Sequence, residues 1–389
     1  MAAGDDLAAA ASDSRSVAQP GSATAAGPVP AAEPGAAGES APPWRLVYVG
    51  SFGGMEEGLV TRESTLPFRA ITAAAVRGRG PLQLARNSAL IARGIREARA
   101  LIRQERPAAI LGTGGYVCIP LFVAARQLGV PTMIYLPDIV PGLAVKVLAR
   151  IANRVACSFE PSLAYLPRGK TIITGYPARE ELFTVDRAGS RAAFGIADDL
   201  PVLFVYGGSR GARSINRAIE ALLPDLLSLA HIIHVCGREG DESWLRAAAD
   251  RLPAELQARY HLFPYLHGTM VQAFGAADLA IARSGASTLA ELPAAQLPAV
   301  LVPYPYVHQD ENADYLVARG AAVKVADSAM LGAGNPIDGP LFREVRRLLT
   351  DRQAREEMAR QSAALARPDA AACLADEVID LALRQGHTR

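Results

Sequence analysis

The stretch Val-Leu-Phe-Val-Tyr-Gly-Gly-Ser-Arg-Gly-Ala-Arg-Ser-Ile-Asn, residues 202–216, indicates the fold of this chain. Residues 202–206 are apolar and rich in β-branched and aromatic side chains, which is typical of a buried parallel strand. The glycines that follow allow backbone amides to approach an anion where the next helix begins with unpaired N–H groups. The stretch therefore predicts a strand–loop–helix unit that can bind a phosphate. It matches neither G-x-G-x-x-G nor a Walker loop, and a tight turn without a ligand is the alternative.

The same alternation of strand, glycine turn and helix continues on both sides of this stretch. We expect further strands at 231–236, about 260–263, 278–282 and 299–303, and upstream at 45–50, 108–111 and 130–135. The spacing of apolar residues predicts helices over 81–106 and 117–128, and a Pro/Gly segment at 174–178 separates the two series. Such alternation implies two parallel sheets with helices on both faces, and ligands in such sheets collect at the carboxyl ends of the strands.

Length and composition favour a folded chain of two domains. Its 389 residues exceed what one core normally organises, and 40 Lys and Arg balance 39 Asp and Glu, so a nucleic-acid partner is not indicated. Residues 1–43 differ, because 31 of them are Ala, Gly, Pro or Ser and none is aromatic. We expect this segment to be disordered. We therefore assign an N-terminal domain to 44–177 and a C-terminal domain to 178–389, with a final helix that crosses back to the N-terminal domain.

Cysteine spacing and hydropathy exclude two further classes. The four cysteines lie far apart without C-x-x-C spacing, so neither a disulfide framework nor a zinc site is indicated. Apolar runs end well before the ~20 residues that cross a bilayer, so membrane contact should be peripheral. Residues 77–106 contain eight arginines among leucines and isoleucines, which suits either an anionic lipid surface or a solvated helix face.

The segment 278–292, Asp-Leu-Ala-Ile-Ala-Arg-Ser-Gly-Ala-Ser-Thr-Leu-Ala-Glu-Leu, is a second candidate binding loop. A strand ends at Arg283, small residues follow, and Glu291 lies in the first turn of the next helix. A carboxylate there can accept hydrogen bonds from both hydroxyls of a ribose. Alternatively, Thr288 and Glu291 form a capping box, in which the glutamate only reaches back to a backbone N–H.

Two further strand ends carry polar or glycine-rich loops. Beyond strand 299–303, Gln309 and Asn312 suit hydrogen bonding to sugar hydroxyls, although such residues also commonly begin helices. In the first series, Ile-Leu-Gly-Thr-Gly-Gly-Tyr-Val at 110–117 is another strand–glycine–helix junction that can hold a phosphate. Two such junctions facing each other across a cleft would suit a diphosphate donor and a diphosphate acceptor.

Five motifs in unbroken order resemble the MurG-type N-acetylglucosaminyltransferases. They are Leu-Gly-Thr-Gly-Gly-Tyr-Val (111–117), Gly-Tyr-Pro-Ala-Arg (175–179), Gly-Gly-Ser-Arg-Gly-Ala-Arg-Ser-Ile-Asn (207–216), Arg-Ser-Gly-Ala-Ser-Thr-Leu-Ala-Glu (283–291) and His-Gln-Asp-Glu-Asn-Ala (308–313). The resemblance implies a GT-B fold of two doubly wound domains. It further implies inverting transfer of N-acetylglucosamine from UDP-N-acetylglucosamine to the undecaprenyl-diphosphate-linked muramoyl-pentapeptide in peptidoglycan synthesis, at the cytoplasmic face of the cell membrane.

The resemblance also assigns roles to residues of this chain. Its donor contacts fall on Gly208 and Ser209 at the diphosphate, Arg179 near the hinge, Leu266 at the uracil, Ala286, Ser287 and Thr288 along the nucleotide, Glu291 at the ribose, and Gln309 and Asn312 at the sugar. Its acceptor side falls on Gly114, Gly115 and Tyr116, and its membrane-facing surface corresponds to the start of the 81–106 helix. No Asp-x-Asp metal motif is present, and we expect neither an obligatory metal nor another cofactor.

Two departures from the family pattern concern the acceptor side. Tyr-Leu-Pro-Asp at 135–138 stands where the family has His-Glu-Gln-Asn, so Asp138 is the acidic candidate for a catalytic base. The family's first strand, its Gly-Gly-Thr-Gly-Gly-His loop and its first helix have no counterpart in 1–43. We therefore expect Met1 to be an internal methionine of a chain that is longer by one βα unit of roughly 25–35 residues.

Three other functions remain open at this point. The same architecture suits another UDP-sugar transferase or a UDP-N-acetylglucosamine 2-epimerase, although an epimerase needs acids and bases that the matching loops scarcely offer. A paralogue that binds nucleotide sugars without turnover is the non-enzymatic alternative.

Overall fold

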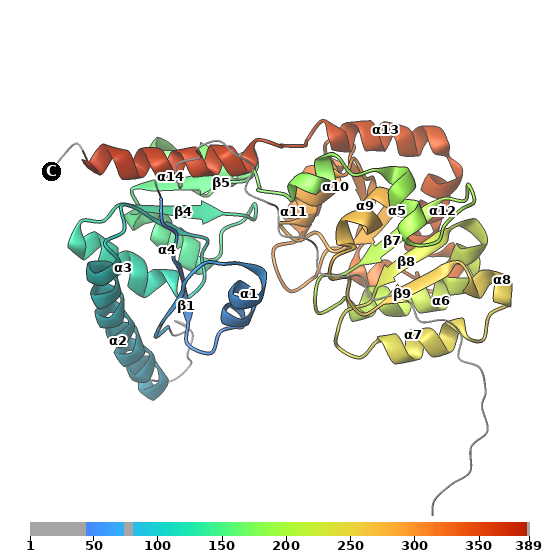
Figure 1. Cartoon of the computed structure of the whole chain (residues 1–389). Coiled ribbons are helices and arrows are strands. Elements are labelled where there is room, and N and C mark those ends of the chain that lie inside the picture. The colour runs from blue at the N-terminus through green and yellow to red at the C-terminus, as the bar shows by residue number, and fades with distance from the viewer. Residues whose placement is uncertain (1–43, 74–80, 387–389) are drawn as a thin grey trace, which may run out of the picture. The chain divides into compact units, whose positions relative to one another are not determined.

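The computed structural model describes residues 44–73 and 81–386, and the segment 1–43 that we expect to be disordered lies outside them. The chain divides into a short unit, residues 1–46, and a large one, residues 47–389. All the elements below belong to the large unit, which is built from parallel β-sheets and helices (Figure 1).

The C-terminal sheet has six parallel strands in the order β12-β11-β10-β7-β8-β9. The strands are β7 (Val202–Tyr206), β8 (His231–Val235), β9 (Tyr260–Phe263), β10 (Leu279–Ala282), β11 (Ala299–Leu301) and β12 (Ala322–Lys324). The strand predicted at 202–206 lies at the centre of the sheet and is wholly buried, as its apolar sequence requires. The chain winds outward from β7 in both directions, so a topological switch point lies between β7 and β10, where open α/β sheets bind ligands.

Helices cover both faces of this sheet (Figure 1). On one face the core contains side chains of α9 (Met270–Ala276), α10 (Thr288–Ala294) and α11 (Asp310–Val317). On the other face it contains side chains of α6 (Arg213–Leu229) and α12 (Pro340–Thr350). The remaining helices are α5 (Arg187–Ala193), α7 (Glu242–Ala249), α8 (Ala254–Gln257) and α13 (Arg352–Ala363).

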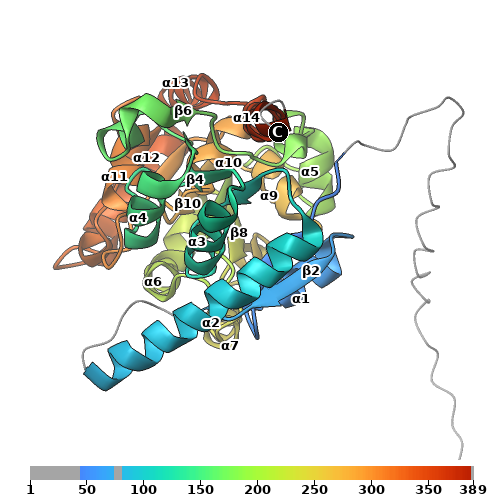
Figure 2. The same ribbon diagram turned by 90° about the vertical axis from the view of Figure 1, so that its left-hand side faces the viewer.

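The N-terminal part contains two parallel sheets. One is β1-β2 and the other is β3-β4-β5-β6. The strands are β1 (Tyr48–Ser51), β2 (Phe68–Ile71), β3 (Ile110–Gly112), β4 (Thr132–Leu136), β5 (Arg154–Cys157) and β6 (Thr171–Ile173), and the helices are α1 (Met55–Glu63), α2 (Pro81–Glu105), α3 (Cys118–Leu128) and α4 (Leu143–Ile151). Ile71 of β2 shares one core with residues of α2, α3 and β4. The long helix α2 runs beside α3 (Figure 2).

The last helix, α14 (Ala370–Gly386), packs on the strands of the N-terminal part. Leu374 and Leu381 of α14 share an apolar cluster with Met133, Tyr135 and Ala156 of β4 and β5. Arg154 at the start of β5 forms ion pairs with Glu377 and with Asp380, the latter at 3.0 Å. Figure 1 shows α14 lying along β4 and β5.

Candidate nucleotide-sugar site

Three loops follow neighbouring strands at one edge of the C-terminal sheet. β7 pairs with β10 and β10 pairs with β11, all in parallel, and the last residues of β7 and β10, Tyr206 and Ala282, lie opposite each other. The loops 207–212, 283–287 and 302–309 therefore begin side by side at the switch point. The candidate segments 207–211 and 284–291 thus begin at one edge of one sheet.

The glycine loop after β7 leaves the amino end of a long helix open. Ala212 precedes α6, and no side chain caps the first turn of that helix. Gly208 and Gly211 have φ of +86°, and Ser209 is exposed between them. Uncapped N–H groups and the positive end of a 17-residue helix dipole are features that favour the binding of an anion.

Glu291 is half-buried in the first turn of α10, directly after the second loop. Burial raises the pKa of its carboxyl group above the ordinary value, while nearby Arg179 and a hydrogen bond with Ser287 act in the opposite direction. Burial, and then the charge of Glu291, also raise the pKa values of the phenols of Tyr176 and Tyr206. Arg179 is therefore close enough for its charge to act on Glu291.

The capping-box alternative for Glu291 is wrong. That arrangement needs Thr288 at the N-cap position, but α10 begins at Thr288 and Ser287 precedes it. No side chain makes a capping hydrogen bond at this helix start. Thr288 is itself buried, whereas Ala286 and Ser287 are partly exposed at the same loop.

Gln309 is oriented toward the second loop. Its Oε1 accepts a hydrogen bond from the backbone N–H of Tyr304 at 2.9 Å, and its carbonyl oxygen accepts one from the Ser284 hydroxyl at 2.7 Å. Its Nε2 lies 4.0 Å from where a Cβ at Gly285 would be. The amide nitrogen is thus presented beside a residue that has no side chain, which leaves room for a ligand group.

Asn312 is wholly buried and holds two loops together. Its Nδ2 donates to the carbonyl oxygen of Ser284 at 2.9 Å and to Oδ1 of Asp138 at 3.1 Å. Its Oδ1 accepts a hydrogen bond from the backbone N–H of Ile139 at 3.3 Å. Because these bonds occupy its amide, Asn312 ties the loop after β4 to the loop after β10.

Leu266 lies in the core that also contains Phe274 and Leu289, and its side chain is buried. The neighbouring Tyr265 is covered by the guanidinium of Arg238, whose Cζ lies 3.9 Å from the centre of the ring. Leu266 thus belongs to the loop after β9, and its side chain points into the core.

The acceptor-side candidates form the loop between β3 and α3. Gly114 and Gly115 have φ of +99° and +80°, and Tyr116 is 43% exposed. No side chain caps α3, and the N–H of Ile119 in its first turn donates to the carbonyl oxygen of Tyr116 at 3.4 Å. A Cβ at Gly114 would lie 3.1 Å from Val145 of α4, so the loop rests on that helix.

Arg283 is a site residue whose role sequence reasoning missed. Its guanidinium donates to Asp327 Oδ1 at 2.6 Å, to Ser214 Oγ at 2.7 Å and to the carbonyl oxygen of Val302 at 3.0 Å. It therefore joins the start of α6 to the loops after β10 and β11. The only signal in the sequence is an arginine at the end of an otherwise apolar strand.

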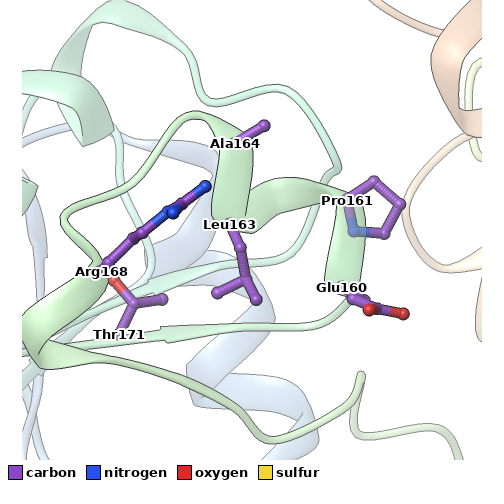
Figure 3. Close-up of a pocket in the computed structure, with 6 residues that line it drawn as sticks. All are labelled: Glu160, Pro161, Leu163, Ala164, Arg168 and Thr171. Carbon is purple, nitrogen blue, oxygen red and sulfur yellow. The ribbon is translucent and has the colours of Figure 1, made fainter.

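A surface pocket of about 530 Å³ has no residue of these loops in its lining (Figure 3). It is lined by Glu160, Pro161, Leu163, Ala164, Arg168 and Thr171. These residues come from the 3₁₀ helices Glu160–Ala164 and Arg168–Lys170 and from the start of β6, and none of them is a predicted site residue.

A glycine loop at an uncapped helix start, a half-buried carboxyl group and an oriented amide lie at the switch point of one doubly wound sheet, where open α/β sheets bind ligands. Further parallel sheets in the same chain give it the two-part architecture of the GT-B class. Models of the glycosyltransferase family 28 N-terminal and C-terminal domains match residues 42–157 and 202–374. The chain belongs to glycosyltransferase family 28, and within it to the MurG-type N-acetylglucosaminyltransferases. The GT-B fold implied by the sequence is confirmed.

Individual relatives agree with this assignment. The UDP-N-acetylglucosamine–N-acetylmuramyl-(pentapeptide) pyrophosphoryl-undecaprenol N-acetylglucosamine transferase of Roseiflexus sp. (strain RS-1) is 58% identical over 374 residues, covering 88% of this chain and 85% of that protein. The crystal structure of Acinetobacter baumannii MurG matches with a TM-score of 0.66 and 28% identity, covering 86% and 91% of the two chains. The UDP-GlcNAc 2-epimerase of Neisseria meningitidis, bound to UDP-GlcNAc, matches with a TM-score of 0.59 at 12% identity over 86% and 91%, which shows the shared fold alone.

Proposed function

We propose that this chain transfers N-acetylglucosamine from UDP-N-acetylglucosamine to undecaprenyl-diphospho-N-acetylmuramoyl-pentapeptide, with inversion at the anomeric carbon. The observation that carries the proposal is the open amino end of α6 beside Glu291 and Gln309 at one sheet edge, in a chain 58% identical to a transferase named for this reaction. The epimerase alternative has only a shared fold in its favour.

The donor is held by all three loops in this proposal. Its diphosphate binds the amides of the 207–212 loop and Ser209, where the α6 dipole stabilises the negative charge of departing UDP. The nucleoside lies along Ala286, Ser287 and Thr288 with Leu266 below it, and its ribose hydroxyls donate to Glu291. The positive charge of Arg179 acts on that carboxylate. The Gln309 amide nitrogen meets the sugar.

The acceptor binds at the loop Gly114, Gly115 and Tyr116, where the amino end of α3 receives its diphosphate. The muramoyl 4-hydroxyl attacks the anomeric carbon in line while UDP leaves. Asp138 takes the proton in this proposal, and its carboxylate is oriented by the hydrogen bond from Asn312. Asn312 is therefore a positioning residue here.

An Asp138→Asn variant tests the proposed base. The change keeps the shape of the side chain and removes its basicity, so we expect kcat to fall about 10²- to 10⁴-fold while the Kd for UDP-N-acetylglucosamine stays within about twofold. Transfer of radiolabelled sugar to a short-chain lipid acceptor gives kcat, and calorimetry gives Kd. Turnover equal to that of the unchanged chain excludes Asp138 as the base.

We further propose that the chain binds the cytoplasmic face of the cell membrane through one side of α4. This side exposes Leu143, at 63%, and Val147, at 45%, next to exposed Lys146 and Arg150. Apolar side chains between basic ones suit the interface of an anionic bilayer.

The start of the 81–106 helix was the first candidate for this contact. The side chains of residues 81–86 lie outside the part of the chain that the structure describes. No described helix has both the length and the apolar content to span a membrane.

A double variant, Leu143→Ser with Val147→Ser, tests this surface. Because two exposed apolar side chains are lost, we expect binding to vesicles of anionic phospholipid to weaken about 10-fold or more. The Kd for UDP should not change. Sedimentation with vesicles measures the first quantity, and Leu383→Ser, an exposed leucine on α14, is the matched control. Equal sedimentation of the double variant and the unchanged chain contradicts the assignment of this surface.

Calorimetry of donor binding and the radiolabel transfer assay together separate the functions. The proposed transferase binds UDP-N-acetylglucosamine and labels the lipid acceptor. Conversion of the sugar nucleotide without an acceptor indicates an epimerase. Binding without either reaction in the full chain indicates a non-catalytic paralogue.

A further inference from the structure

The glycine loop after β7 interlocks with the loop after β8. Gly211 and Gly237 have φ of +86° and +92°. A Cβ at Gly211 would lie 2.0 Å from the carbonyl oxygen of Cys236, and a Cβ at Gly237 would lie 2.3 Å from the nitrogen of Gly211. The two loops therefore touch backbone to backbone, and residues 236–237 restrict where Arg210 and Gly211 can lie.

Asn216, near the start of α6, holds the loop after β8 in place through hydrogen bonds. Its side chain is 2% exposed. Its Nδ2 donates to the carbonyl oxygen of Cys236 at 2.8 Å and to Oδ2 of Asp241 at 2.9 Å. Both partners are acceptors only, which fixes the orientation of the amide and leaves its Oδ1 as an acceptor.

His234 of β8 supplies the hydrogen bond to that oxygen. Its Nε2 lies 3.0 Å from Asn216 Oδ1 and must be the donor, so its Nδ1 accepts from the hydroxyl of Tyr260 at 2.8 Å. The ring is wholly buried, and burial lowers the pKa of His234 to about 3, so it is neutral at physiological pH. The direction of each bond in the chain Tyr260 to His234 to Asn216 is therefore determined.

Asp241 links this series of hydrogen bonds to Arg213, in the first turn of α6. Its Oδ1 accepts a hydrogen bond from Nε of Arg213 at 2.9 Å, and its side chain is buried. The network thus connects β8, β9 and α6 beneath the glycine loop. Both Nδ2 and Oδ1 of Asn216 have hydrogen-bond partners in this network.

We propose that Asn216 and His234 are positioning residues for the donor diphosphate, which hold Cys236 and Gly237 against Gly211 so that the loop amides face the anion. This inference rests on the proposed donor site. The nucleoside half of that site lies on the loops after β9 and β10. The side-chain bonds of the network end at Cys236 and Asp241, and the loop after β8 contacts the loop after β9 through Arg238, at Tyr265 and His267. Loss of the network should therefore weaken binding of the diphosphate and spare that of the nucleoside.

Binding of UDP and of uridine to four variants of the full chain tests the proposal. Asn216→Ala and His234→Leu each leave buried groups unpaired, and we expect UDP to bind about 10- to 100-fold more weakly while uridine changes less than about twofold. His234→Gln keeps a nitrogen donor near the position of Nε2 and should restore UDP binding to within about threefold. Tyr260→Phe removes only one hydroxyl and should give a smaller loss of the same kind.

His231→Leu is the matched control, because His231 is a buried histidine at the opposite end of β8. It should leave both affinities unchanged. Equal weakening of UDP and uridine by Asn216→Ala and His234→Leu indicates a merely structural role and overturns the proposal, as does unchanged UDP binding. If either variant fails to fold, Tyr260→Phe gives the same comparison, and unchanged UDP binding by it overturns the proposal. An unchanged chain that binds no UDP instead contradicts the proposed function.

Discussion

A Gly211→Ala variant is expected to lose both stability and donor binding. Its φ of +86° costs a side-chain-bearing residue roughly 1–2 kcal/mol, and a Cβ placed 2.0 Å from the Cys236 carbonyl oxygen forces the loops apart at roughly 1–3 kcal/mol more. The free energy of unfolding should therefore fall by about 3 kcal/mol. Because the added Cβ displaces the glycine loop together with its backbone amides, UDP affinity should fall at least about 10-fold.

Gly240→Ala is the matched control for this prediction. Gly240 has φ of +89°, and a Cβ there would have no heavy atom within 4 Å. An alanine there has the same unfavourable backbone conformation as at Gly211, but its Cβ does not clash with another atom. Denaturant unfolding gives the two stabilities and calorimetry the two UDP affinities. Equal effects of the two substitutions would contradict close packing of the glycine loop.

A Glu291→Gln variant should bind the donor poorly and yet be no less stable. Glutamine replaces one acceptor oxygen by a donor, so it cannot accept from both ribose hydroxyls, and we expect kcat/KM for UDP-N-acetylglucosamine to fall about 10²-fold or more. The loss should be similar with UDP as the ligand, because the ribose is common to both. Glu255→Gln, on an exposed residue of α8, should change neither quantity.

A second test of Glu291 compares how the stability of the unchanged chain and that of the Glu291→Gln variant depend on pH. Burial raises the pKa of this carboxyl group, so above the ordinary pKa the folded chain binds more protons there than the unfolded chain. Its contribution to stability therefore decreases as the pH rises through the raised pKa, and Glu291→Gln removes this decrease. Donor affinity of the unchanged chain has the opposite trend, because the ionised carboxylate is the form that accepts both hydroxyls. A variant that is less stable than the unchanged chain at neutral pH would contradict this assignment of Glu291.

The central strands were predictable because their sequences are distinctive. Residues 202–206 and 260–263 form strands with the predicted bounds, and both are followed by loops rich in glycine or proline. The strands β2, β5, β6 and β12 were not predicted, since each has only three or four residues and contains a polar one. Such short strands are held by pairing with neighbours far away in the sequence, and local patterns do not record that pairing.

The loops of the candidate site were predictable, but not the contacts that hold them. Motifs located Ser209, Glu291 and Gln309 at strand ends, and the pairing of β7, β10 and β11 places them at one edge. Asn312 resembled an exposed helix-start residue and is a buried link to Asp138, 174 residues away. The bonds of Asn216 and Arg283 likewise join distant segments. Only the fold determines such partners.

The most direct test is a crystal structure of the full chain with UDP-N-acetylglucosamine. We predict that diphosphate oxygens accept hydrogen bonds from backbone N–H groups between Gly208 and Arg213, and that the ribose hydroxyls lie on Glu291. A diphosphate bound elsewhere, with the amino end of α6 facing only solvent, would contradict the account.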